Sequence, residues 1–276
     1  MNIKIISEEN IHDFFQILTS DEIFGINDGR FTSFVILSEE NKEPAGVMTV
    51  QIYPEYIKLE RIFVLPEFRR SGYGASLLEI IKNRPGDALL PIFAFLEDQE
   101  DVRGLLEAEG FSMQESSYSV LSASLKDFTD LGTRLKKLIP DDIRKEIMIY
   151  RMDQISDELL RDFVLRSPHD EVLQFPDRMI DLDRFSDLSM VSMTDNTIKA
   201  ALLIEETEDY SQFTWCHGTD RYSIFATIFM VKRELESEYG PEYKIRCLCL
   251  DENTEQVYKK LFSDCIRTKI DVYKFV

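Results

Sequence analysis

Apolar and polar residues alternate in short runs along the first 125 residues, and segments with helical spacing separate these runs. The runs predict strands at residues 3–6, 32–37, 45–53, 57–64, 89–96 and 112–125. Three helices are predicted. The first follows Ser7 and has an apolar face of Ile11, Phe14, Phe15 and Leu18. The second covers residues 71–82 and ends before Arg84-Pro85-Gly86, and the third ends at Glu109-Gly110-Phe111. Gly110 suits the left-handed conformation that commonly closes a helix. The alternation predicts a mixed α/β domain.

The second half repeats this outline faintly. It predicts helices at residues 157–165 and 224–239, a hairpin at 190–205, and strands at 244–250 and 268–276. Phe95-Leu96-Glu97-Asp98 leads into a helix as Cys249-Leu250-Asp251-Glu252 does, and Glu97 and Asp251 are 154 residues apart. A second strand–helix unit at a similar separation favours tandem related domains. We expect domains at residues 1–125 and 141–276, joined by a helical segment at 126–140.

The charge of the chain limits its partners. Acidic residues outnumber basic ones by 51 to 32, and the formal net charge is −19. Such a field repels nucleic acid and anionic lipid and attracts cations, although charge also serves solubility alone. No stretch approaches the ~18 apolar residues of a membrane span, and the first residues become acidic too soon for a signal peptide. We therefore expect no nucleic acid or membrane partner and a cytoplasmic location.

The cysteine and histidine residues do not suggest a metal site. Cys247 and Cys249 alternate along one predicted strand and so share a face. Two further ligands would be needed for a metal ion, and the remaining residues show no matching pattern. The remaining cysteine and histidine residues are Cys216, Cys265, His12, His169 and His217. Reduced thiols and no metal are the expected state.

The most specific segment runs from residue 59 to residue 78. It combines a strand, a turn at Pro66, the basic pair Arg69 and Arg70, glycines at 72 and 74, and an apolar helix. Glycines allow a ligand to approach the backbone closely, and the helix start offers unpaired N–H groups and a positive dipole. This is what a pyrophosphate requires, whereas a lone pair of glycines before a helix is usually only a tight turn.

The whole pattern, Val64-X-Pro66-Glu67-X-X-Arg70-X-Gly72-X-Gly74, resembles the acyl-CoA-binding signature of the GNAT N-acetyltransferase superfamily. The resemblance covers residues 1 to 125 and is weaker beyond them. It implies a mixed, mostly antiparallel sheet flanked by helices, here in tandem, with acetyl-CoA as co-substrate and direct attack of an amine on the thioester. By this resemblance the cofactor-binding residues are Ile62, Phe63, Val64, Arg69, Arg70, Ser71, Gly72, Tyr73, Gly74 and Ala75.

Glu60 is the candidate general base, because relatives often have a carboxylate at this place in the strand. Its apolar neighbours would remove it partly from water, which makes a carboxylate a better proton acceptor. The alternative is that Glu60 only pairs with Arg61, Lys58 or a neighbouring strand. Leu106 stands where many relatives have the tyrosine that protonates the thiolate. Gln99 replaces the usual asparagine, and Tyr118 or water could supply the proton instead.

The second half lacks the loop and resembles a degenerate GNAT-like domain. A single glycine, Gly218, and no arginine pair precede its long helix. Asn253 and Tyr258 match the family's Asn…Tyr helix, and Trp215 and His217 would line an acceptor pocket or be ordinary core and surface residues.

Two classes of function follow from the resemblance. The leading prediction is an N-acetyltransferase acting on a small-molecule or peptide amine, with a cationic acceptor slightly favoured by the charge. The alternative is a non-catalytic acyl-CoA-binding or sensing module, and a larger acyl donor is a third candidate. The sequence does not choose the acceptor or the oligomeric state.

Overall fold

The computed structural model describes residues 2–40, 42–53, 56–83, 90–97, 99–128, 146–166, 185–207, 209–249 and 251–276 of the 276-residue chain. The chain forms two compact units. The first comprises Met1–Ser116 and Ile270–Val276, and the second comprises Ser117–Lys269. The predicted helix end at Arg84-Pro85-Gly86, His169 and most of the predicted connecting segment 126–140 lie outside the described residues.

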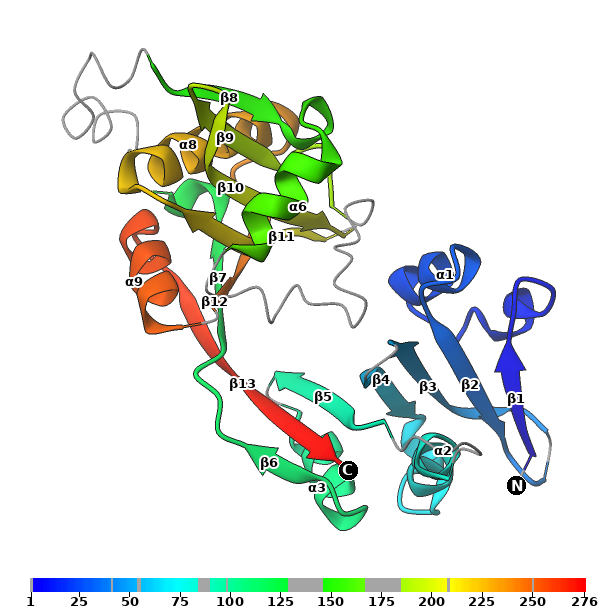
Figure 1. Ribbon diagram of the computed structural model, residues 1–276. Coiled ribbons are helices and arrows are strands. Elements are labelled where there is room, and N and C mark those ends of the chain that lie inside the picture. The colour runs from blue at the N-terminus through cyan, green and yellow to red at the C-terminus, as the bar shows by residue number, and fades with distance from the viewer. Residues whose placement is uncertain are drawn as a thin grey trace. The chain divides into compact units, whose positions relative to one another are not determined.

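The first unit contains most of the predicted elements (Figure 1). Its elements are β1 (Asn2–Ile6), the 3-10 helix η1 (Ile11–Phe14), α1 (Ser20–Asn27), β2 (Thr32–Leu37), β3 (Pro44–Ile52), β4 (Ile57–Val64), the 3-10 helix η2 (Pro66–Phe68), α2 (Tyr73–Lys82), β5 (Ile92–Glu97), α3 (Glu100–Ala108) and β6 (Ser112–Gln114). The strand order is β1-β2-β3-β4-β5-β13, and β6 also pairs with β13. Among the described strands of this unit, β4 and β5 alone run parallel, so the predicted, mostly antiparallel sheet is confirmed.

Both faces of this sheet are covered, because neighbouring residues of β2 and β3 point to opposite sides. Val35, Leu37 and Val47 pack with apolar residues of η1 and α1. Ile36 and Met48, one position away, pack with apolar residues of α2 and α3. The sheet therefore has a helical layer packed on each face.

The second unit has the same layout. Its elements are β7 (Ser119–Ser124), the 3-10 helices η3 (Leu125–Asp127) and η4 (Met152–Gln154), β8 (Met148–Arg151), α6 (Asp157–Leu165), β9 (Met190–Thr194), β10 (Thr197–Glu206), β11 (Tyr210–Gly218), α8 (Arg221–Glu238), β12 (Lys244–Cys249), α9 (Glu252–Leu261) and the first part of β13 (Ile266–Phe275). Strands β8 to β12 follow the order of β1 to β5, and β11 and β12 are again the parallel pair. Helix α6 covers one face, and α8 and α9 cover the other. The predicted tandem fold is confirmed.

The unit boundaries differ from the expected domain ranges, because the predicted strand 112–125 and the C-terminal strand β13 each contribute to both units. The predicted strand 112–125 is split into β6, in the first unit, and β7, which pairs with β12 in the second. Strand β13 pairs through Ile270–Phe275 with β5, and through Ile266–Lys269 with β7. The last strand of the first sheet therefore comes from the C-terminus. Periodicity reveals a strand but does not reveal its partner.

The N-terminal helix also differs from the prediction. The structure has η1 and then α1, which begins after Thr19. Ile11 and Phe14 are buried as expected, but Phe15 is 52% exposed. Thr19 and Glu22 form a capping box, in which each side chain bonds to the other residue's backbone N–H. This signal is present in the sequence and marks the start of the helix more reliably than the apolar spacing.

Candidate acyl-CoA site

The site begins where β4 separates from β5. The parallel pairing of these strands ends at Leu59 and Ala94. On the other side of β4, the register with β3 passes from Arg61–Thr49 to Leu59–Val50 and so skips Glu60. Glu60 is the extra residue of a β-bulge, a feature that bends a strand and redirects a side chain. Beyond the bulge, residues 60–64 of β4 lie along a pocket instead of along β5.

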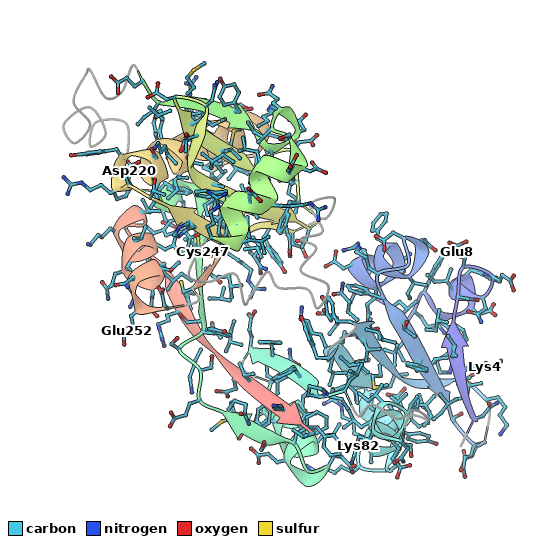
Figure 2. The ribbon with its side chains drawn as sticks, viewed as in Figure 1. Lys4, Glu8, Lys82, Asp220, Cys247 and Glu252 are labelled. Carbon is cyan, nitrogen blue, oxygen red and sulfur yellow. The ribbon has the colours of Figure 1, made fainter. Side chains whose placement is uncertain are left out.

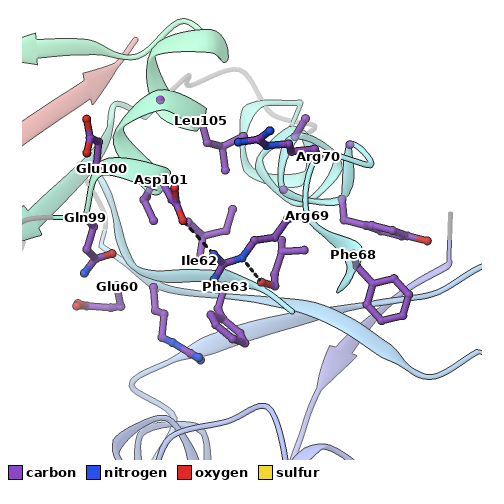
Figure 3. A pocket seen from close by; sticks show the side chains of 18 residues that line it. Glu60, Ile62, Phe63, Phe68, Arg69, Arg70, Gln99, Glu100, Asp101 and Leu105 are labelled. Carbon is purple, nitrogen blue, oxygen red and sulfur yellow. Dashed lines mark hydrogen bonds and ion pairs between the residues drawn. The ribbon is translucent and has the colours of Figure 1, made fainter. Parts of the chain in front are cut away.

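The pocket has a volume of about 1020 Å³ and lies within the first unit. Figure 3 shows side chains from β4, the following loop, α2 and α3 around it. Nine of the ten predicted cofactor-binding residues and Glu60 line it, and Ser71 is not among them. From α3 and its approach come residues for which the sequence suggested no binding role: Gln99, Glu100, Asp101, Val102, Gly104 and Leu105. The pairing of α3 with this loop depends on tertiary structure, and no local pattern reveals it.

The loop before α2 has the backbone of an anion site. Arg70 has φ = 60° and Gly72 has φ = 82°, so two left-handed residues turn the chain within three positions. Such turns direct successive N–H groups to one side and form an anion-binding concavity. Gly72 is the N-cap of α2 and provides no side-chain cap, and the first turn contains no acidic residue. The first N–H groups of the helix are thus left for a ligand or water.

Arg69 lies across this pocket (Figure 3). Its Nε donates to the Val64 carbonyl oxygen at 3.1 Å, and its Nη1 donates to Asp101 Oδ2 at 2.9 Å. The Asp101 side chain is 86% exposed, so the ion pair is weak. An anionic ligand could therefore draw Arg69 away from Asp101 at little cost.

Gly74 has a packing role as well as the predicted ligand role. A Cβ atom at this position would lie 2.8 Å from Cδ2 of Leu105 on α3. The missing side chain therefore lets α2 and α3 approach each other beside the pocket. Only the flexible end of the leucine is close, so a small residue would require a modest shift.

Glu60 is half-buried and has an ion-pair partner. Lys58 Nζ lies 2.8 Å from Glu60 Oε1, and the Glu60 side chain is 21% exposed. The pairing with Lys58 that the sequence offered as an alternative is thus present. This ion pair is compatible with proton transfer, because the Glu60 carboxylate lines the pocket and both side chains of the pair are partly exposed to solvent.

The two positions linked to a general acid do not supply one in the pocket. Leu106 is fully buried in the core cluster of the first unit. Tyr118 belongs to the second unit, where it packs against the cluster of Leu160, Val164 and Trp215. Arg61, for which the sequence suggested only a pairing role, lines the pocket beside Glu60.

The second unit has the same bulge without the same chemistry. The register of β10 and β11 skips Thr214, which stands 154 residues after Glu60 and is 3% exposed. Asp220 caps α8 and accepts hydrogen bonds from the Ser223 N–H and hydroxyl, both at 2.9 Å. Figure 2 shows Asp220 at the start of this helix. A carboxylate thus occupies the helix start where α2 has only Gly72, which disfavours a pyrophosphate.

Three other residues singled out in the second unit pack in or beside its core. Trp215 is 1% exposed, Tyr258 is fully buried, and His217 packs against the rings of Phe163 and Trp215. Cys247 and Cys249 share one face of β12, as predicted, and both are buried. Burial raises the pKa of the Cys249 thiol to about 12 and that of Cys247 well above its usual value. Among the described residues, no three His, Cys, Asp or Glu side chains gather as metal ligands.

The fold and this pocket define a class of protein. They combine a bulged strand, parallel strands that separate, and an uncapped helix start beside them. The sequence model of the acetyltransferase (GNAT) family matches residues 4–108 of this chain. Among curated proteins, none matches the sequence significantly.

Solved structures extend the likeness to the second unit. A tandem GNAT protein from the clavulanic acid biosynthesis pathway matches with a TM-score of 0.69 and 9% identity, over 99% of this chain and 98% of that one. A GNAT acetyltransferase from Colwellia psychrerythraea matches with a TM-score of 0.56 and 14% identity, over 100% of both chains. A GCN5-related N-acetyltransferase from Sphaerobacter thermophilus matches with a TM-score of 0.58 and 12% identity, over 97% of this chain and 84% of that one. At these identities the likeness concerns the fold.

A membrane-spanning helix is not found: within the part of the chain that the structure describes, every helix is too short or too polar to cross a bilayer.

Proposed function

We propose that the first unit binds acetyl-CoA in this pocket and transfers the acetyl group to an amine. The observation that carries the proposal is the continuity of the pocket. It runs from the open edge of β4, beside Glu60, to the turn of Arg70 and Gly72. An extended amide-containing arm can pair with a strand edge, and a pyrophosphate can accept N–H bonds from a helix start.

The N–H groups of residues 70–75 and the Arg69 and Arg70 side chains would hold the pyrophosphate. The β4 backbone from Ile62 to Val64 would pair with the pantetheine arm, and this would bring the thioester close to Glu60. A backbone N–H of this segment would stabilise the negative charge that develops on the thioester oxygen.

Glu60 would accept the proton that the attacking amine loses. A nitrogen–carbon bond forms, the carbon–sulfur bond breaks, and the thiolate leaves. The thiolate would take its proton from water, because the aliphatic Leu106 side chain cannot supply one. The strand and loop contribute mostly by holding two reactants together, which can account for a large part of a rate enhancement.

Thermal unfolding at increasing concentrations of acetyl-CoA tests binding. Release of the CoA thiol in the presence of amines tests transfer. Suitable probes are spermidine, an aminoglycoside, Nα-protected lysine and a short peptide with a free N-terminus. Binding without transfer to any probe would favour the acyl-CoA-binding module, which the replacement of the tyrosine by Leu106 supports. Absence of acetyl-CoA binding would contradict the proposed transfer, and binding of a longer acyl-CoA instead would point to the larger acyl donor.

A further inference from the structure

A buried carboxylate, Glu22, lies behind the bulge that carries Glu60. Glu22 is on α1 and is 4% exposed. Its Oε1 accepts a hydrogen bond from Thr49 Oγ1 at 2.5 Å, and its Oε2 accepts one from Arg61 Nη1 at 2.7 Å. The two oxygens of one carboxylate therefore join β3 to β4.

The position of this contact in the register is specific. Thr49 and Arg61 face each other across β3 and β4, and they are the last regular pair before the register skips Glu60. Ser33, opposite Thr49 on β2, extends the row through a hydroxyl contact of 2.8 Å. Glu22 thus connects a helix to three neighbouring strands at the edge of the bulge.

Arg61 is held on three sides. Besides Glu22, its Nη1 donates to the Ile17 carbonyl oxygen at 3.1 Å. Its guanidinium carbon lies 4.7 Å from the centroid of the Phe63 ring. Both Arg61 and Phe63 line the pocket, so the residues on either side of Ile62 connect the contacts of Glu22 to the site.

We propose that Glu22, Thr49 and Arg61 form a clamp that fixes the bulge, and that Glu22 is a positioning residue for Glu60. The extra residue of a bulge has no partner on the neighbouring strand, so its orientation depends on how firmly the adjacent pair is held. A catalytic group must be held within a fraction of an ångström, and buried supporting contacts provide this. The inference rests on the proposed role of Glu60.

Glu22 also has a capping role, and this must be separated from the clamp. Its Oε2 accepts bonds from the Thr19 N–H at 2.9 Å and from the Thr19 hydroxyl at 3.2 Å. Thr19→Ala removes the hydroxyl of the capping box but leaves both clamp contacts of Glu22. It is therefore the matched control for Glu22→Gln, which keeps the size of the side chain and removes its charge.

Hydrogen exchange tests the clamp without an amine substrate. Neighbouring residues of a strand direct their N–H groups to opposite sides, so only one of the Arg61 and Ile62 amides bonds to β3. In the full-length protein, this bonded amide should exchange at least about tenfold faster in Glu22→Gln than in Thr19→Ala. Amides at the far end of β2, at Ile36 and Leu37, should remain alike in the two variants. Equal exchange of the bonded amide in both variants would overturn the clamp.

A double-mutant cycle with Glu60→Gln tests the positioning role. Turnover at saturating acetyl-CoA is measured with whichever of the four amine probes the wild-type protein acetylates fastest. Glu22→Gln should lower kcat about tenfold or more when Glu60 is present, and less than about twofold in the Glu60→Gln background, because it acts through Glu60. Acetyl-CoA affinity should stay within about twofold of wild type.

The outcomes separate the two proposals. An equal loss of kcat in both backgrounds would mean that Glu22 only stabilises the fold, and the positioning role would be wrong. Unchanged turnover in Glu60→Gln alone would remove the role of Glu60 as the proton acceptor, and the positioning role with it, although acetyl transfer would stand. No acetylation of any probe would contradict the proposed transfer itself. The exchange experiment would still decide whether the clamp holds the bulge.

Discussion

Lys58 and Glu60 form an ion pair of 2.8 Å on one strand, at the point where β4 leaves β5. The pair is solvent-accessible, and such pairs contribute at most about 1 kcal/mol. Lys58→Met should therefore change the turnover of amine acetylation by less than about fivefold. Glu60→Gln should lower it by about 10²-fold or more, because a general base is lost. Equal small effects of both changes would identify Glu60 as a structural residue.

The two glycines of the loop should respond differently to alanine. Gly72 has φ = 82°, so Gly72→Ala forces a side chain into the left-handed region and should lower the free energy of unfolding by about 1–2 kcal/mol. Gly74→Ala displaces only the end of Leu105 and gains helix propensity. It should therefore change the free energy of unfolding by less than about 1 kcal/mol. Urea unfolding of both variants measures this, and a reversed order would contradict the loop geometry.

Glu255 predicts an acid dependence of stability in the second unit. Burial favours its protonated form, but hydrogen bonds from Lys259, Arg267 and Ser119 outweigh this and lower its pKa from 4.5 to about 2. A lowered folded-state pKa adds stability above pH 4.5, and this stability is lost as the pH falls toward 2. The contribution is on the order of 2 kcal/mol after allowance for the partly exposed basic partners.

The measurement is urea unfolding of wild type and Glu255→Gln between pH 7 and pH 3. The variant should be less stable at pH 7, and the difference should shrink below pH 4.5. Lys259→Gln removes one partner and should give a smaller version of the same trend. A difference that stays constant with pH would mean that the Glu255 charge is not the cause.

The sequence predicted the elements well, because strand alternation and glycine positions are local signals. It also predicted the residues of β4 and the loop that line the pocket, and the tandem repeat. It could not assign partners to β6, β7 and β13, because pairing between distant strands leaves no local pattern. The contribution of Asp101 and Leu105 to the pocket, and of Glu22 to the bulge, depends in the same way on tertiary contacts.

If acetyl-CoA binds at the start of α2, it should raise the melting temperature of the protein, and thermal unfolding with and without acetyl-CoA measures this. Ligand at about 100 times its dissociation constant adds about 2.7 kcal/mol of stability, a rise in Tm of several degrees. Gly72→Glu should abolish this rise, because the glutamate would place a bulky negative side chain at the anion site. Gly29→Glu is the matched control, since Gly29 also has a positive φ, of 80°, and lies in open space outside the pocket.

We expect acetyl-CoA to raise Tm in wild type and in Gly29→Glu, and not in Gly72→Glu. No rise in wild type, or an equal rise in all three proteins, would contradict binding at this loop.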